Sequence, residues 1–262
     1  MCLIAFAYTV HPAYRLVLAA NRDEFYDRPT APLGHWQDHT EILAGRDLQQ
    51  QGTWMGVNAR GCIAAITNYR DPKNIKPGAP SRGHLVSDYL LGDMPPTQYL
   101  QSIQAAADKY NGFNLIVGDP DGLFYFSNYD QTIRKVEAGV HGLSNHLFDS
   151  PWPKVQRSKS KLQEVLNSGG KFSEEKIWRL LQDQTPAPDH HLPDTGIDFA
   201  WERMLSPVFI TSPTYGTRSS SLLTVDHQGR FRFSEITWQP GQPKPTEAFR
   251  RSFAFHIPMK GP

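Results

Sequence analysis

The feature of the sequence that most restricts the fold is a recurring pair of short apolar runs separated by a turn. The clearest pair is residues 52–57 and 62–67, which flank Asn58-Ala59-Arg60-Gly61. Asn and Gly are favoured in tight hairpin turns because they tolerate the positive φ that such turns need. Similar pairs occur at residues 3–8 and 15–20, 113–118 and 123–127, and 217–225 and 230–236. Hairpins are antiparallel, so the sequence predicts mainly antiparallel sheets.

Helical patterns are concentrated in the middle of the chain. Helix caps such as Ser173 and stop residues such as Gly92 bracket stretches with one apolar face. The predicted helices are residues 81–91, 97–110, 154–166 and 174–182; short strands are predicted at 133–137, 139–143 and 252–257, and a loop rich in Pro and His at 28–39. The order is a run of strands, then helices, then strands again, and such segregated runs are typical of α+β proteins. No repeat or composition shift marks a boundary, so residues 1–262 are predicted to form a single domain.

Composition excludes several classes of function. The 27 basic and 26 acidic residues give a net charge of +1, and no basic run forms a nucleic-acid footprint. No apolar run approaches the roughly 20 residues of a membrane span, and no signal-peptide pattern precedes Cys2. Cys2 and Cys62 lack zinc-site spacing, and the ten His residues lack an HExxH pattern. We therefore expect a cytoplasmic protein without a bound metal whose partner is a small molecule.

Several buried runs end abruptly in polar residues. Asn21-Arg22-Asp23-Glu24 follows residues 15–20, Asn68-Tyr69-Arg70 follows 62–67, and Ser144-Asn145-His146 follows 139–143. Antiparallel pairing of runs 3–8 and 15–20 would bring the first of these groups to the start of the chain, beside Cys2. The alternative is ordinary turn and cap chemistry at strand ends.

Cys2 is the candidate nucleophile. Removal of Met1 would leave a residue that carries both a thiol and a free α-amine, whose pKa values lie near about 8.5 and 7.7–8.0. The amine could then take the thiol proton directly or through one water. The alternative is that Cys2 is a small buried apolar residue, the usual state of a free cysteine. Cys62 has no polar cluster beside it in sequence and is expected to be inert.

The order and spacing of these segments resemble a known family. The segments are Met1-Cys2, Asn21-Arg22-Asp23-Glu24, Thr67-Asn68-Tyr69-Arg70, Leu143-Ser144-Asn145-His146 and Tyr215-Gly216-Thr217-Arg218-Ser219-Ser220. Together they resemble the NRDE family, also called the transport and Golgi organisation protein two family, over nearly the whole chain. More distantly they are similar to N-terminal-nucleophile (Ntn) hydrolases of the choloylglycine hydrolase and penicillin V acylase type. The resemblance implies an α+β fold, a four-layer αββα sandwich of mainly antiparallel sheets.

The resemblance also implies roles for particular residues. The implied catalytic residues are Cys2 as nucleophile, Arg22 beside its thiol, Asp23 holding the α-amine, Asn68 and Asn145 as amide groups of the site, and Arg218 closing it. Asn21 and Tyr69 are expected to contact the substrate. The hydrolases separate their Arg and Asp by two residues, whereas Arg22 and Asp23 are adjacent and would face opposite ways on a strand. It is left open whether Arg22 and Asp23 both take the roles of their counterparts in the hydrolases.

Two functions follow from these observations. The first is an Ntn-type cysteine hydrolase or acyltransferase that acts on a small amide or acyl substrate through a Cys2 thioester, with no cofactor. The alternative is a non-catalytic carrier or chaperone of haem or of acyl-CoA and lipid, because the NRDE family is linked to haem trafficking and lipid homeostasis. Both predict that Cys2, Asn21 to Asp23, Asn68, Asn145 and Arg218 converge in one pocket.

Overall fold

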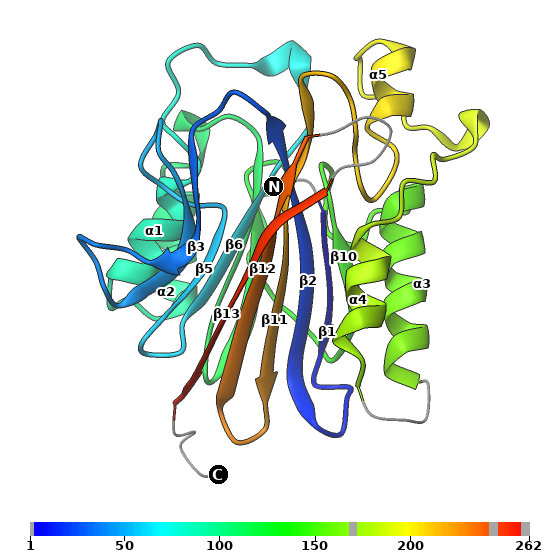
Figure 1. The fold of residues 1–262 in the computed structure, drawn as a ribbon. Coiled ribbons are helices and arrows are strands. Elements are labelled where there is room, and N and C mark those ends of the chain that lie inside the picture. Colours follow the sequence, from blue (N-terminus) through cyan, green and yellow to red (C-terminus); the bar gives the residue numbers. More distant parts are fainter. Residues whose placement is uncertain (1–2, 168–171, 241–245, 258–262) are drawn as a thin grey trace. The chain divides into compact units, whose positions relative to one another are not determined.

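The protein, seen in a computed structural model, is described at residues 3–167, 172–240 and 246–257 (Figure 1). The chain divides into two compact units. Unit 1 comprises Met1–Asp27, Ala138–Ser144 and Phe148–Pro258, and unit 2 comprises Arg28–Glu137, Asn145–Leu147 and Met259–Pro262. Each unit contains one antiparallel sheet packed against helices. The α+β class with two antiparallel sheets is thus confirmed, while the four-layer stacking and the single domain stay predictions.

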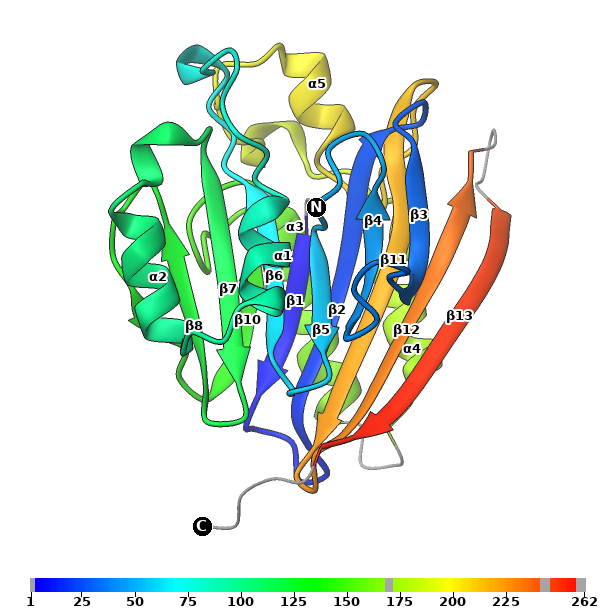
Figure 2. The ribbon, with the colours of Figure 1, turned by 90° about the vertical axis from the view of Figure 1, so that its left-hand side faces the viewer.

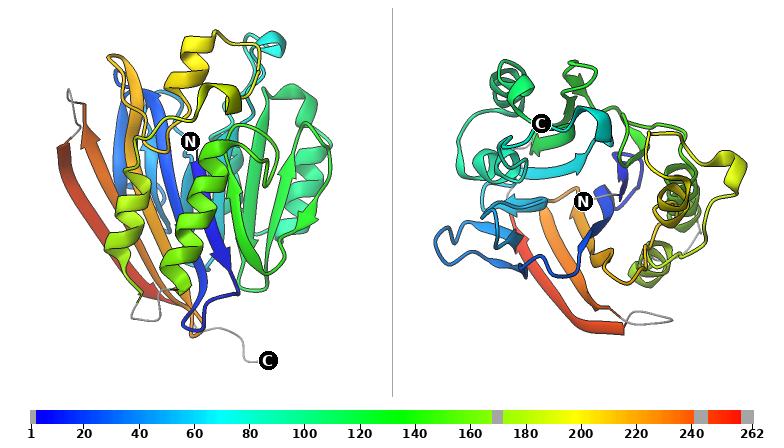
Figure 3. Two further views of the ribbon diagram at one scale, coloured as in Figure 1. Left: turned by 90° about the vertical axis from the view of Figure 1, so that its right-hand side faces the viewer. Right: turned by 90° about the horizontal axis from the view of Figure 1, so that it is seen from above.

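Unit 1 is built on a six-stranded sheet. Its strands, in sheet order, are β10 (Gly139–Leu143), β1 (Leu3–Tyr8), β2 (Tyr14–Phe25), β11 (Tyr215–Asp226), β12 (Arg230–Gln239) and β13 (Thr246–His256). Helix α3 (Pro153–Asn167) packs on β1 and β10, and α4 (Glu174–Leu181) packs on β2 and β11 (Figure 3). A 3-10 turn (Asp189–His191) and α5 (Phe199–Met204) lie in the connection from α4 to β11.

Strand alternation decides which side chains of this sheet face the helices. Ala5, Val17 and Ala19 belong to the buried cluster that also contains Leu162 of α3 and Trp178 of α4. The small alanines leave room for the bulky Trp178 between helix and sheet, as close packing requires. Burial of each large apolar side chain contributes about 1.5–3 kcal/mol. The residues between these positions, such as Leu18, point to the other face of the sheet.

Unit 2 is built on a seven-stranded sheet in which neighbouring strands are consecutive in sequence. They are β3 (Thr30–His35), β4 (Ile42–Asp47), β5 (Met55–Asn58), β6 (Ile63–Asn68), β7 (Phe113–Asp119), β8 (Gly122–Ser127) and β9 (Arg134–Lys135). Helix α1 (His84–Leu91) packs on β5, β6 and β7, and α2 (Pro96–Gln104) packs on β7 and β8 (Figure 2). Two 3-10 turns, Pro72–Asn74 and Ala107–Lys109, flank these helices.

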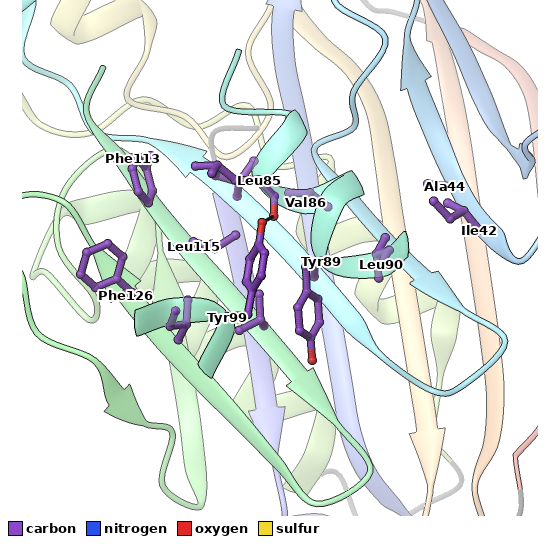
Figure 4. Packing of buried hydrophobic residues seen from close by; sticks show 14 of the residues in the cluster. Ile42, Ala44, Leu85, Val86, Tyr89, Leu90, Tyr99, Phe113, Leu115 and Phe126 are labelled. Carbon is purple, nitrogen blue, oxygen red and sulfur yellow. Dashed lines mark hydrogen bonds between the residues drawn. The ribbon is translucent and has the colours of Figure 1, made fainter. Parts of the chain in front are cut away.

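Two tyrosines anchor the helices of unit 2 in its core (Figure 4). The hydroxyl of Tyr99 in α2 donates to the main-chain oxygen of Leu85 in α1 at 2.8 Å. The hydroxyl of Tyr89 donates to the main-chain oxygen of Gly118 on β7 at 3.0 Å. Burial raises the pKa of both hydroxyls, so they remain neutral donors at physiological pH. In the core of unit 2, hydrogen bonds as well as apolar contacts therefore join α2 to α1 and α1 to the sheet.

The predicted hairpins are confirmed, and several boundaries are corrected. β3 occupies part of the predicted loop at 28–39. The presence of Pro32 argued against a strand there, but β3 is an edge strand with a register shift, and Pro is tolerated in such strands. The helix predicted at 97–110 ends at Gln104, α1 begins at His84 without a side-chain cap, and β13 starts at Thr246. Helix α5, capped by Asp198, was not predicted from the sequence.

Candidate functional site

The residues Asn21 to Glu24 lie inside β2, whereas the sequence predicts them after the end of the buried run 15–20. β2 runs to Phe25, and Leu3 of β1 pairs with Asn21. On the other side of β2, β11 pairs with the same segment through Thr217, Ser219 and Ser220. A strand can contain these polar residues because their side chains find partners inside unit 1. The segment Gly216 to Ser220 of β11 and the segment Asn21 to Glu24 of β2 are therefore neighbours that pair with each other in the sheet.

Asn21 is held entirely by unit 1. It is fully buried, and its Nδ2 donates to the main-chain oxygens of Leu181 and Val208, both at 2.8 Å. The hydroxyl of Ser220 donates to Asn21 Oδ1 at 2.6 Å and accepts from Trp238 Nε1 at 2.9 Å. Both amide hydrogens and the amide oxygen are thus used within the protein. We assign Asn21 a structural role in place of the expected substrate contact.

Replacing Asn21 with Ala is expected to destabilise the protein. The main-chain oxygens of Leu181 and Val208 would lose their donor, at about 1–3 kcal/mol for each buried group left without a partner. Chemical unfolding of the two proteins measures the loss. Asn74→Ala is the control, because Asn74 is exposed and is expected to change stability by less than about 0.5 kcal/mol. Equal stability of Asn21→Ala and the wild type would contradict the structural role.

Asp23 is buried and tied to β11. The hydroxyl of Thr217 donates to Asp23 Oδ1 at 2.6 Å and accepts from the main-chain nitrogen of Ile210 at 3.0 Å. Together with burial, the charge of Asp23 raises the pKa of Tyr26. Strand alternation puts Asp23 and Asn21 on the face toward α4 and Arg22 on the opposite face. The adjacent Arg22 and Asp23 therefore act on different sides of the sheet.

Arg218 occupies a β-bulge. The register of β11 against β2 shifts between Thr217 and Ser219, so Arg218 is the extra residue. Its Nη1 donates to the main-chain oxygen of Phe25 at 2.8 Å. Burial lowers the pKa of Arg218, an effect opposed by the nearby Glu24, Tyr26 and Asp27. An arginine remains charged under these conditions, so Arg218 contributes a fixed cation at this end of unit 1.

In unit 2, Asn68 and Asn145 contact each other. Asn145 Nδ2 donates to the main-chain oxygen of Asn68 at 3.0 Å, and the main-chain oxygen of Asn145 accepts from Arg70 at 2.8 Å. Buried Asn114 supports the same segment, because its Nδ2 donates to the main-chain oxygen of His146. The Asn68 amide makes no hydrogen bond to another residue in the described part of the chain. Of the two amides, that of Asn68 is thus available to a ligand.

Tyr69 lies in an aromatic stack. Its ring is parallel to that of Tyr129, with centroids 3.6 Å apart, and lies 5.1 Å from that of His146. Gly112 makes the stack possible, because a Cβ there would lie 2.7 Å from Tyr129 Cε2. Burial and Asp71 raise the pKa of Tyr69, and burial lowers that of His146, so both rings are neutral at pH 7. The substrate contact expected of Tyr69 stays a prediction.

The sequence motifs missed the partners of these residues. Thr217 and Ser220 lie in the segment Tyr215 to Ser220 on which the family resemblance rests, but no role was predicted for them. A hydroxyl residue that pairs with Asp23 or Asn21 was the signal that could have identified them. His146 was also part of a quoted segment without a role, and Tyr129 gave no signal, since the contacts of both with Tyr69 depend on the packing of unit 2. The predicted residues fall in both units: Asn21, Arg22, Asp23 and Arg218 in unit 1, and Asn68, Tyr69 and Asn145 in unit 2. Their convergence in one pocket stays a prediction.

The two cysteines differ in what can be described. Cys2, the predicted nucleophile, lies outside the described residues. Cys62 is a free thiol, half-buried against the core cluster of unit 2 that contains Tyr89. Among residues 3–167, 172–240 and 246–257 there is no group of metal-ligating side chains, and no helix there has the length and apolar character needed to cross a membrane.

Comparison of the sequence with known families is decisive. The profile described as Transport and Golgi organisation 2 matches residues 1–240. The chain belongs to this family. Transport and Golgi organization protein 2 homolog of Bos taurus is 34% identical over 273 residues, covering 97% of this chain and 99% of that protein. The Homo sapiens homolog is 34% identical over 255 residues, and the Drosophila melanogaster protein is 27% identical over 266 residues. Each of these two matches covers 90% of this chain and 92% of the other protein.

Solved structures with similar backbones include two hydrolases. Penicillin V acylase from Agrobacterium tumefaciens has a TM-score of 0.49 at 12% identity, covering 98% of this chain and 86% of that chain. A variant of conjugated bile acid hydrolase from Clostridium perfringens has a TM-score of 0.47 at 8% identity, covering 100% and 99%.

Proposed function

We propose that this family member is a cysteine hydrolase or acyltransferase that cleaves a small amide or acyl substrate through a thioester on Cys2. The observation that carries the proposal is the register of β1, β2 and β11. Leu3, which follows Cys2 in the sequence, pairs with Asn21, and β11 pairs with Arg22 and Asp23 on the other side of β2. The proposal places the Cys2 thiol at this end of β2, which contains two buried charged residues, Arg22 and Asp23, 4% and 3% exposed.

Burying charged groups is costly, and charged residues buried near a potential nucleophile are candidates for a functional site. A guanidinium near the thiol would lower the pKa of Cys2 and increase its thiolate fraction. With Met1 removed, the α-amine would take the thiol proton, and a carboxylate such as Asp23 would orient that amine. Together, the guanidinium, the α-amine and the carboxylate would activate the Cys2 thiol at neutral pH, so that its sulfur can attack a carbonyl carbon.

Attack by the Cys2 sulfur forms the C–S bond and moves the carbonyl π electrons onto oxygen. The amide of Asn68 would donate to this oxyanion. Collapse of the tetrahedral intermediate expels the amine or alkoxide leaving group, which takes the proton held by the α-amine. Water, or another acceptor in a transferase, then attacks the thioester and restores the thiol. The free amide of Asn68 and the Asn145 contact that holds its main chain support this role.

The experiment that tests the proposal is reactivity mapping of the two thiols. Intact-protein mass should show that Met1 is absent, and iodoacetamide at pH 7 should label Cys2 faster than Cys62. We expect a difference of at least about tenfold, because a cation beside the Cys2 thiol would lower its pKa and increase its thiolate fraction. Retained Met1, or faster labelling of Cys62, would contradict the proposal and favour a non-catalytic carrier.

A further inference from the structure

The last strand of the unit 1 sheet has an open edge. β13 is the outermost strand of this sheet, and within the described chain it pairs with β12 alone (Figure 2). Residues 246–252 are all exposed, and so is Ala254. Long side chains can reach solvent from beneath a covering segment, but small ones cannot. The exposure of Ser252 and Ala254 therefore indicates that solvent reaches the edge of the strand itself.

The pairing with β12 determines which main-chain groups point to this edge. The main-chain nitrogen of Ile257 donates to the main-chain oxygen of Gly229 at 2.9 Å, so these two residues form a hydrogen-bonded pair. Such pairs alternate with non-hydrogen-bonded pairs along an antiparallel ladder, and the register of β13 has no shift between Phe249 and His256. The odd-numbered residues of this stretch thus bond to β12. The even-numbered residues point their N–H and C=O groups to the open edge; they are Arg250, Ser252, Ala254 and His256.

β13 lacks most of the features that protect strand edges. Native proteins usually prevent pairing with another chain by Pro, Lys, bulges or short length at an exposed edge. Residues 246–257 contain neither Pro nor Lys, and the bulge at Ala248 lies near the beginning of the strand. The side chain of Phe249, which follows the bulge, is 41% exposed. A regular stretch with open main-chain groups and an exposed aromatic side chain fits another β-strand.

We propose that this other strand is β13 of a second copy of the chain, paired antiparallel about a two-fold axis at Ser252. A two-fold axis pairs residues at equal distances from its centre, so even-numbered residues of both strands exchange their main-chain hydrogen bonds. Arg250 then lies opposite Ala254 of the second copy. Phe249 lies opposite Phe255, and an aromatic pair across two strands stabilises a sheet. The two sheets become one continuous sheet, and the exposed ring of Phe249 gains an apolar neighbour.

The arginines of β13 select this register among the possible ones. An axis at Arg250 or at Arg251 would place two copies of that guanidinium opposite each other, and like charges in direct pairs are destabilising. An axis at Phe253 would place Arg250 opposite His256, a second basic residue. An axis at Ala254 would leave Phe249 beyond the end of the other strand. The axis at Ser252 avoids opposed basic residues and also covers Phe249.

Cross-linking between copies tests both the dimer and its register. In a chain with Cys2→Ala and Cys62→Ala, a single thiol is introduced by Ser252→Cys or, as the matched control, by Ala254→Cys. An axis at Ser252 puts the two Cα atoms of residue 252 about 5.5 Å apart, within disulfide range, and those of residue 254 about 14 Å apart. We expect mild oxidation to link Ser252→Cys into a covalent dimer at least about tenfold faster than Ala254→Cys.

Sedimentation equilibrium measures the association without a cross-link. At about 100 μM, well above micromolar dissociation constants, the wild-type chain should have the mass of a dimer. Ala254→Pro removes an N–H that points to the open edge, where Pro is tolerated, so it should raise the dissociation constant at least about tenfold with little change in unfolding temperature. Ala254→Val keeps that N–H and should remain a dimer.

Three results would overturn the proposal. A monomeric wild-type chain would exclude a second copy as the partner and leave the edge to a strand of another protein. Association that survives Ala254→Pro would place the interface on another surface, and Ala254→Cys that cross-links as fast as Ser252→Cys would exclude the register. The cysteine variants decide even where Ala254→Pro does not fold. None of these outcomes depends on Cys2, so the dimer and the proposed function stand or fall separately.

Discussion

Replacing Cys2 with Ala is expected to abolish turnover while leaving the fold intact. Loss of a catalytic nucleophile lowers the rate by roughly 10⁴–10⁶-fold, because no other group can form the covalent intermediate. The substitution removes one sulfur atom from a small side chain, and the core clusters described in the two units contain large side chains such as Tyr89 and Trp178 that it leaves unchanged. The measurement is release of amine or free thiol from a panel of acyl amides and acyl-CoA esters, alongside the thermal unfolding midpoint of both proteins.

Two comparisons make this result specific. Cys2→Ser should be nearly as inactive as Cys2→Ala, because a hydroxyl is much harder to deprotonate than a thiol. Cys62→Ala should retain wild-type turnover, since Cys62 packs against the apolar cluster of unit 2. A carrier predicts a different pattern, in which Cys2→Ala binds haem or acyl-CoA as the wild type does and neither protein cleaves any ester or amide. That pattern would rule out the hydrolase and transferase reading.

The sheets were predictable because turn chemistry and apolar runs act locally. Asn58 and Gly61 specify their hairpin whatever surrounds it, and Gly61 indeed has a positive φ of 82°. The end of β2 was not predictable in this way. Asn21 and Asp23 look like loop residues in sequence, and only Leu181, Val208 and Thr217, far away in the chain, provide the partners that let the strand continue.

The site shows the same division between local and distant causes. Motif order identified Asn68 and Asn145, and the structure joins them by a hydrogen bond. Motif order could not predict which amide is engaged, since that depends on the main-chain direction of Asn68 and on its contact with Asn145. It also could not predict that the buried hydroxyls of Ser219 and Thr237 have no hydrogen-bond partner among the described residues, because this depends on every residue that packs around them.

Replacing Asn68 with Ala is expected to lower kcat by roughly 10²–10³-fold with little change in KM. The amide would donate to the oxyanion, a charge that exists only in the transition state and the tetrahedral intermediate, so its loss affects the rate more than substrate binding. The substitution keeps the main-chain oxygen that accepts from Asn145, so the local structure should persist. Steady-state kinetics on the substrate found with the acyl panel gives both constants.

Asn68→Asp and Asn145→Ala distinguish a lost donor from a disturbed loop. Asn68→Asp keeps the size of the side chain but removes its donor and adds a negative charge, so it should be at least as slow as Asn68→Ala. Asn145→Ala removes the hydrogen bond to the Asn68 main chain and should lower the unfolding temperature as well as the rate. If Asn68→Asp keeps wild-type kcat, the oxyanion donor is another group. If Asn68→Ala raises KM and leaves kcat unchanged, Asn68 binds the ground state instead.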